Sequence, residues 1–179
     1  MSVMPTNPIY NNLDPAWYDF RNQGEAVTFK PGFAREADAG EKINGETADA
    51  GDLVITNAGG RTFRVSDEIE KKRWKLDGEK PQTYMERGKL VSGHVATYAG
   101  PPVMAVKAGE SGFLPAPKEW QGHSGWMLLP EDRIVRDQLP GKEPVFYAMQ
   151  KRQFEAATES WTPPAPKAEP PPRRFGMTG

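Results

Sequence analysis

The chain has 179 residues, among them 18 glycines and 18 prolines, and it contains no cysteine. Its 23 Lys and Arg residues are balanced by 24 Asp and Glu residues, so it lacks the basic excess typical of nucleic-acid-binding proteins. The missing cysteines exclude disulfides, thiolate nucleophiles and cysteine-ligated zinc. Frequent prolines argue against long helices, because proline interrupts them. We therefore expect a turn-rich protein with a modest core that does not bind nucleic acid.

The N-terminal region, residues 1–24, is predicted to be an extended arm that ends in a short helix. Asp14 stands where a helix N-cap is expected, and Pro15 follows at the first helical position. Residues 1–13 lack the basic and apolar regions of a signal peptide, and no apolar run is long enough to span a bilayer. These features favour a cytoplasmic protein without membrane contact, or a virion-associated one if a phage encodes it.

The clearest pattern in the first half is a β-hairpin. Residues 53–56 are mainly apolar and β-branched, as in a buried strand, and they follow a Gly51-Asp52 turn. Gly60 suits a tight turn, because glycine accepts positive φ, and residues 62–65 alternate polar and apolar side chains. For Asp52, the carboxylate is expected to accept hydrogen bonds from nearby backbone N–H groups.

A short charged helix is predicted after this hairpin. Ser66 would be its N-cap, acidic residues follow in the first turn and basic ones in the last, which suits the helix dipole. Ile69 and Trp74 are its expected buried anchors. The polar residues 77–90 are predicted to be a connector.

The second half, residues 91–160, is predicted to repeat strands and one short helix. Strands are expected at 91–98, 103–107, 126–129 and 145–149, and the helix at 150–156. Residues 130–143 are predicted to be a charged excursion that carries an apolar pair at Ile134. Residues 161–179 are rich in proline, so we expect an extended tail outside the core.

The two halves share a spacing that indicates an internal repeat. When Phe63 is placed over Tyr147, Val65 falls on Met149 and Trp74 falls on Thr158. Upstream, we place residues 53–55 over 126–128. The alternative is that ordinary patterning produced two similar units independently.

Residues 50–74 resemble a small domain of bacterial and phage proteins that is named for a Pro-Gly-Asp-Tyr-Gly motif. Ala50 takes the place of the proline and Leu53 that of the aromatic residue. Residues 124–154 resemble it less, because no Asp follows a glycine there. The resemblance implies an α+β fold of mostly antiparallel β structure. It would comprise two small strand-turn-strand-helix units, at 25–76 and 91–160, with extended termini. It implies no activity.

No motif with a defined chemistry is present. His94 and His123 have no metal-ligand spacing, and neither a phosphate-binding loop nor a dinucleotide fingerprint occurs, so we expect no metal and no cofactor. Ligand-binding candidates are Asp52, Arg61, His123 and Trp126. Candidates for contact with a protein partner are the aromatic residues outside the expected core and the apolar pair of the excursion, namely Trp17, Tyr18, Trp120, Ile134 and Trp161. Core packing is the alternative for the aromatic ones.

Three functions fit these features. The favoured one is a non-catalytic binding or assembly protein of phage or mobile-element origin, which contacts a protein partner or a second copy of itself. The second is a module that binds or senses a small, nucleotide-type molecule in a cleft between the two units. The third is a carboxylate-dependent hydrolase, which would show a buried carboxylate or His123 in a pocket.

Overall fold

The computed structural model describes residues 11–118, 120 and 124–163. The predicted N-terminal arm before residue 11, His123 and the proline-rich tail beyond residue 163 lie outside the described residues.

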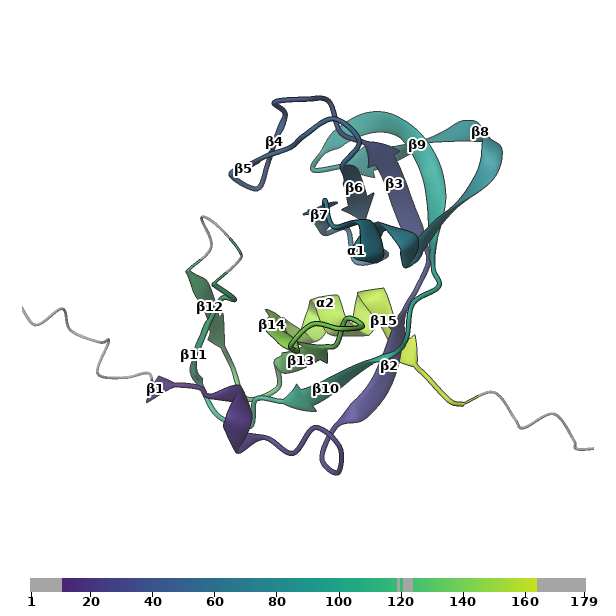
Figure 1. Cartoon of the computed structure of the whole chain (residues 1–179). Coiled ribbons are helices and arrows are strands. Elements are labelled where there is room, and N and C mark those ends of the chain that lie inside the picture. Colours follow the sequence, from purple (N-terminus) through teal and green to yellow (C-terminus); the bar gives the residue numbers. More distant parts are fainter. Residues whose placement is uncertain (1–10, 119, 121–123, 164–179) are drawn as a thin grey trace, which may run out of the picture.

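Most of the described chain forms two five-stranded sheets (Figure 1). The first has the order β7-β6-β3-β9-β8, with β3 at Gly32–Glu36, β6 at Leu53–Thr56, β7 at Thr62–Val65, β8 at Trp74–Glu86 and β9 at Lys89–Tyr98. The second has the order β14-β13-β10-β2-β15, with β2 at Glu25–Phe29, β10 at Val103–Lys107, β13 at Arg133–Asp137, β14 at Val145–Met149 and β15 at Thr158–Ser160. All neighbouring strands in both sheets are antiparallel, so the prediction of a mostly antiparallel β protein is confirmed.

Smaller elements flank the two sheets. Strands β4 (Lys42–Ile43) and β5 (Glu46–Thr47) form a hairpin, and β1 (Asn11–Asn12) joins β11 (Gly112–Pro115) and β12 (Gly125–Leu128) in a three-stranded sheet. The helices are short: a 3₁₀ turn η1 (Pro15–Trp17), α1 (Glu68–Lys72) and α2 (Lys151–Ala157). No helix of the described residues is long and apolar enough to cross a membrane.

The chain crosses between the two sheets twice. Strand β2 of the second sheet continues into β3 of the first, and β9 of the first continues into β10 of the second (Figure 1). As a result, residues 25–86 and residues 89–160 run through elements in the same order: two strands, a small hairpin, two strands, a helix and a strand. The strands also pair in the same way in the two sheets. The pair β3–β6 corresponds to β10–β13, the pair β6–β7 to β13–β14, and the pair β8–β9 to β15–β2.

The turns before β6 and β13 share one hydrogen-bond pattern. Asp52 accepts from the backbone N–H of Asp49 at 2.9 Å, and Asp132 accepts from that of Leu129 at 2.8 Å. Both aspartates are buried. The predicted role of Asp52 in fixing the backbone is confirmed. In the second half the similar turn lies at Asp132, before the strand β13 that pairs with β14, and not before the strand near residue 126.

The expected strand pairing in the second half was wrong. Strand β12 pairs with β11 in the three-stranded sheet, and only the last of its residues is buried. The charged excursion contains the central strand β13, in which Ile134 is completely buried. Ile134 is therefore excluded as a surface contact, because both neighbouring strands and the core cover it.

Residues 77–90 are not a connector. They form most of the long β8–β9 hairpin, whose pairing is interrupted by an irregularity between Asp77 and Gln82. The helix prediction needs a smaller correction: Asp67, not Ser66, caps α1 by accepting from the backbone N–H of Ile69 at 2.8 Å. Ile69 is exposed because α1 is too short to bury a face, whereas Trp74 is buried as predicted.

Each large sheet has its own apolar core. In the first sheet, Ile55, Val65 and Trp74 belong to a buried cluster against which Phe29 and Phe63 pack as partly buried residues. In the second, a cluster that includes Val135 and Phe154 is flanked by Tyr147 and again by Phe29. The partly buried rings of Phe29, Phe63 and Tyr147 lie where the two cores approach each other, and they line a cavity there.

Candidate functional site

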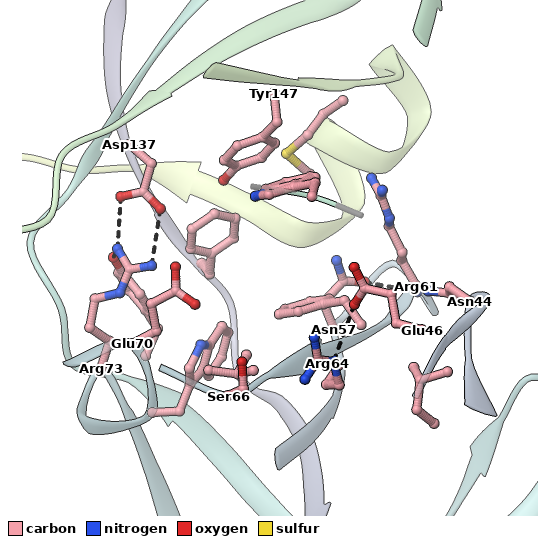
Figure 2. Close-up of a pocket in the computed structure, with 18 residues that line it drawn as sticks. Asn44, Glu46, Asn57, Arg61, Arg64, Ser66, Glu70, Arg73, Asp137 and Tyr147 are labelled. Atoms are coloured by element: carbon pink, nitrogen blue, oxygen red, sulfur yellow. Dashed lines mark hydrogen bonds and ion pairs between the residues drawn. The ribbon is translucent and has the colours of Figure 1, made fainter. Parts of the chain in front are cut away.

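A cavity of about 300 Å³ lies between the two five-stranded sheets (Figure 2). Its lining comes from β7, α1 and the adjoining ends of β8 and β9 on one side, and from β2, β13 and β14 on the other. The turn between β6 and β7, the β4–β5 hairpin and Trp120 complete the wall. Residues that are distant in sequence therefore meet at one site because the chain crosses between the sheets.

Aromatic rings form much of the cavity wall. Tyr147 stacks on Trp120 with 5.9 Å between ring centroids and 29° between ring planes. Phe29 meets Tyr98 edge-on at 5.1 Å, and Phe63 packs near Trp74 at 6.3 Å. Phe29, Phe63, Trp120 and Tyr147 are only partly buried, so they present apolar and π surface to the cavity.

A bidentate ion pair joins the two sheets at the cavity. Arg73, next to α1, donates from Nη1 and Nη2 to the two carboxylate oxygens of Asp137 in β13, at 2.8 and 3.0 Å (Figure 2). Both side chains are 13% exposed. A second polar link runs from Gln153 Nε2 in α2 to the carbonyl oxygen of Gly59 at 2.9 Å. The cavity is thus bounded by contacts that hold the sheets together.

Arg64 is also neutralised within the protein. Its Nε lies 3.2 Å from Glu46 in β5, and its Nη1 lies 3.0 Å from Asp52. Burial opposes ionisation of the Asp52 carboxyl, but hydrogen bonds from the Asp49 backbone and from Arg64 outweigh it, and its pKa is lowered overall.

Two charged groups of the lining have no such partner. Within the described residues, the Arg61 guanidinium and the Glu70 carboxylate make no side-chain hydrogen bond and no ion pair within 4.0 Å. Burial raises the pKa of the Glu70 carboxyl, and the negative charge of Asp137 adds to the effect, while Arg73 partly offsets it. Burial likewise raises the pKa of the Tyr147 phenol, so Tyr147 is a neutral hydroxyl at physiological pH.

The predicted ligand-binding residues separate into different places. Arg61 lines the cavity. Asp52 is outside the lining but binds Arg64, which belongs to it. Trp126 is one step removed, since its ring meets Trp120 edge-on at 5.6 Å. His123 lies outside the described residues.

The predicted partner contacts also differ in exposure. Trp17 is 61% exposed on η1. Tyr18 is partly buried and its hydroxyl donates to the carbonyl oxygen of Ala108 at 2.7 Å. Trp120 lines the cavity, and Trp161 is half-buried with its backbone N–H bound to Ala26 at 2.9 Å. Of these residues, only Trp17 presents most of its side chain to solvent.

Sequence reasoning missed Glu70, Arg73 and Asp137 as site residues. Each belongs to an ordinary charged stretch, and nothing local distinguishes it from solvated neighbours. Only the pairing of β13 with β10 and β14, and the position of α1, bring these groups to one cavity.

The described residues contain no group of three or more His, Cys, Asp or Glu side chains placed to hold a metal ion. Comparisons with protein-family models, curated proteins and solved structures found no match to this chain.

Proposed function

We propose that the chain is a non-catalytic binding module that holds a small planar molecule in the cavity between its two sheets. The observation that carries this proposal is the set of partly exposed aromatic rings, contributed by both sheets, around a cavity of about 300 Å³. Small-molecule sites are typically concave and mainly apolar, with a few polar groups that fix orientation. The volume is at the lower end of the range for such sites, about 300–1,000 Å³, which favours a ligand of one ring or a small fused ring system.

Polar groups around the rings support the same proposal. Asn57, Ser66 and the Tyr147 hydroxyl line the cavity together with the charged residues (Figure 2). Such groups can give a ring a defined orientation by hydrogen bonding to its substituents. A carboxylate-dependent hydrolase would require a carboxylate in the cavity, and Glu70 is a half-buried one, but we assign Glu70 to ligand binding instead.

We further propose that the two sheets are diverged copies of one unit, of the kind that the Pro-Gly-Asp-Tyr-Gly-like pattern marks. The shared order of elements, the matching strand pairs and the matching turns at Asp52 and Asp132 support it. Ligand sites occur preferentially at interfaces between domains, and the cavity lies at the interface between the two proposed copies.

A fragment screen would test the binding function. We expect ligand-observed NMR to find single-ring aromatic fragments that bind the protein and lose binding in Ser66→Phe, because that side chain would occupy part of the cavity. Ser92→Phe is the matched control, since Ser92 is exposed on β9 and outside the cavity lining. A screen without hits, or hits that bind both variants equally, would contradict the proposal.

Assembly with a protein partner is the second candidate. The observation that favours it is the exposure of Trp17, because a large aromatic side chain at the surface often anchors an interface. Sedimentation of the full chain with and without Trp17→Ala tests self-association. A concentration-dependent dimer that the substitution abolishes would support it, and a monomer at all concentrations would exclude self-association.

A further inference from the structure

The charges of the cavity do not cancel pairwise. Three arginines and three acidic residues line it, namely Arg61, Arg64, Arg73, Glu46, Glu70 and Asp137. Arg73 is bound to Asp137 through two hydrogen bonds, and Arg64 is bound to Glu46 and to the buried Asp52. Arg61 and Glu70 are left, one cation and one anion, without a side-chain hydrogen bond or an ion pair within 4.0 Å among the described residues.

These two groups lie at different ends of the cavity. Arg61 precedes β7 and Glu70 follows it in α1, and a strand of four residues is about 13 Å long. Figure 2 shows Glu70 beside Arg73 and Arg61 on the opposite side of the view, with Tyr147 above the space between them. Arg61 and Glu70 are thus too far apart in the fold to neutralise each other directly.

A charged group at a partly buried site is costly unless it is paired, because water solvates it less well there. The raised pKa of the Glu70 carboxyl reflects this cost. A ligand that brought a positive group or hydrogen-bond donor to Glu70, and a negative group to Arg61, would satisfy both. The aromatic walls between the two groups would hold the ring that connects them.

We infer that the cavity selects dipolar planar ligands: an aromatic ring that carries an ammonium or amidine-type donor at the end near Glu70 and a carboxylate at the end near Arg61. The inference rests on the proposed function and specifies its ligand. Glu70 and Arg61 are the specificity-determining residues, and the aromatic residues provide the part of the affinity that does not depend on charge.

Four matched benzene derivatives separate these contributions. The dipolar probe is 4-(aminomethyl)benzoate, the cation is 4-methylbenzylamine, the anion is 4-methylbenzoate and the neutral compound is 4-methylbenzyl alcohol. They have nearly the same size and shape, so differences in affinity report charge. Because a hydrogen bond to a charged group is strong, we expect the dipolar probe to bind about tenfold or more tightly than the neutral one, with the two singly charged probes between them.

Reciprocal variants then assign each charge to its residue. Glu70→Gln should weaken the dipolar and cationic probes about tenfold and leave the anionic probe unchanged. Arg61→Gln should weaken the dipolar and anionic probes and leave the cationic probe unchanged. Glu131→Gln and Arg152→Gln are the controls, because both side chains are exposed and outside the cavity lining. Thermal unfolding of each variant establishes that it is folded.

The outcomes separate this inference from the proposal beneath it. Equal affinity for all four probes, or equal effects of both variants on every probe, would overturn the dipolar specificity and leave the binding function standing. Failure of all four probes to bind, while fragments of another charge pattern bind and are lost in Ser66→Phe, would also overturn the specificity alone. Absence of any binding in the fragment screen would overturn both.

Discussion

The ion pair between Arg73 and Asp137 gives the most specific prediction about stability. Asp137→Asn keeps the size of the side chain and removes the charge that holds Arg73. Removing one partner of a fully buried pair costs about 3–5 kcal/mol, whereas a fully exposed pair contributes about 0–1 kcal/mol. Both side chains are 13% exposed and joined by two hydrogen bonds, so the pair lies closer to the buried case. Because asparagine still accepts one hydrogen bond, we expect a loss of about 2–3 kcal/mol.

Glu70 should reduce this loss, since its carboxylate interacts electrostatically with Arg73 and has no ion-pair partner in the described chain. The double variant Asp137→Asn with Glu70→Gln is therefore expected to show coupling: the stability that Glu70→Gln gains in the wild type at pH 7 should be reduced or reversed in the Asp137→Asn background. Such coupling would show that Arg73 can move from one carboxylate to the other.

Urea denaturation at pH 7 measures these differences. The control is Glu131→Gln, which removes the partner of Lys107 in a pair whose side chains are 58% and 60% exposed, and it should change stability by less than about 0.5 kcal/mol. If Asp137→Asn changed the free energy of unfolding no more than this control, the ion pair would not hold the two sheets together and the account of the cavity wall would be refuted.

Three further predictions concern single side chains. Gly60→Val should lower the free energy of unfolding by about 1–3 kcal/mol in urea denaturation, because Gly60 has a φ of +83° that valine adopts only with strain. The space around its Cβ position is open, so the loss would not come from a clash. Gly60→Asn should lose less, and equal losses in both variants would argue against backbone strain. The pKa of the Glu70 carboxyl is raised in the folded protein, so the folded state loses stability as the pH rises above about 4.5. Glu70→Gln should therefore be more stable than the wild type at pH 7 and equally stable below pH 4. A variant less stable than the wild type at pH 7 would contradict this. Arg35 lowers the pKa of Glu41 to about 2, so Glu41 contributes stability that is present above pH 4.5 and is lost as the pH falls towards 2. Glu41→Gln should be less stable than the wild type at pH 7 and equally stable near pH 2. A difference in stability that stays constant across this range would exclude the coupling between Glu41 ionisation and folding.

Local signals were sufficient to predict part of the fold. The Gly-Asp turn, the hairpin around Gly60 and the helix start at Asp14 depend on residues close together in sequence, and each is present. The burial of Trp74 was also correct. These features are predictable because turn and cap geometry restrict which residue types fit.

The errors have a common cause in non-local pairing. Strand β8 is mainly exposed and so lacks the alternation that marks a half-buried strand, which is why its sequence resembled a connector. Charged residues next to Ile134 concealed the strand β13. The exchange of β2 and β9 between the sheets cannot be read from any local pattern, because it depends on which strands pair across the chain.

The same reasoning explains the candidate site. Arg61 was selected because it adjoins a recognisable hairpin, but Glu70 looked like an ordinary solvated helix residue. Its position in a cavity depends on strands β13 and β14 of the second sheet, which follow it far along the chain, and on β2 of the same sheet, which precedes it. Binding sites formed between two units are predictable from sequence only when the units and their contact are both known.

The central claim is that a small planar ligand binds between the two sheets, and backbone amide NMR tests it most directly. Titration of the ¹⁵N-labelled full chain with 4-(aminomethyl)benzoate should shift the amide signals of cavity residues, above all around Arg61, Glu70 and Tyr147. Signals around Trp17 and the β8–β9 hairpin tip should stay unchanged. Saturable shifts that cluster around Trp17, with none at the cavity, would contradict the claim.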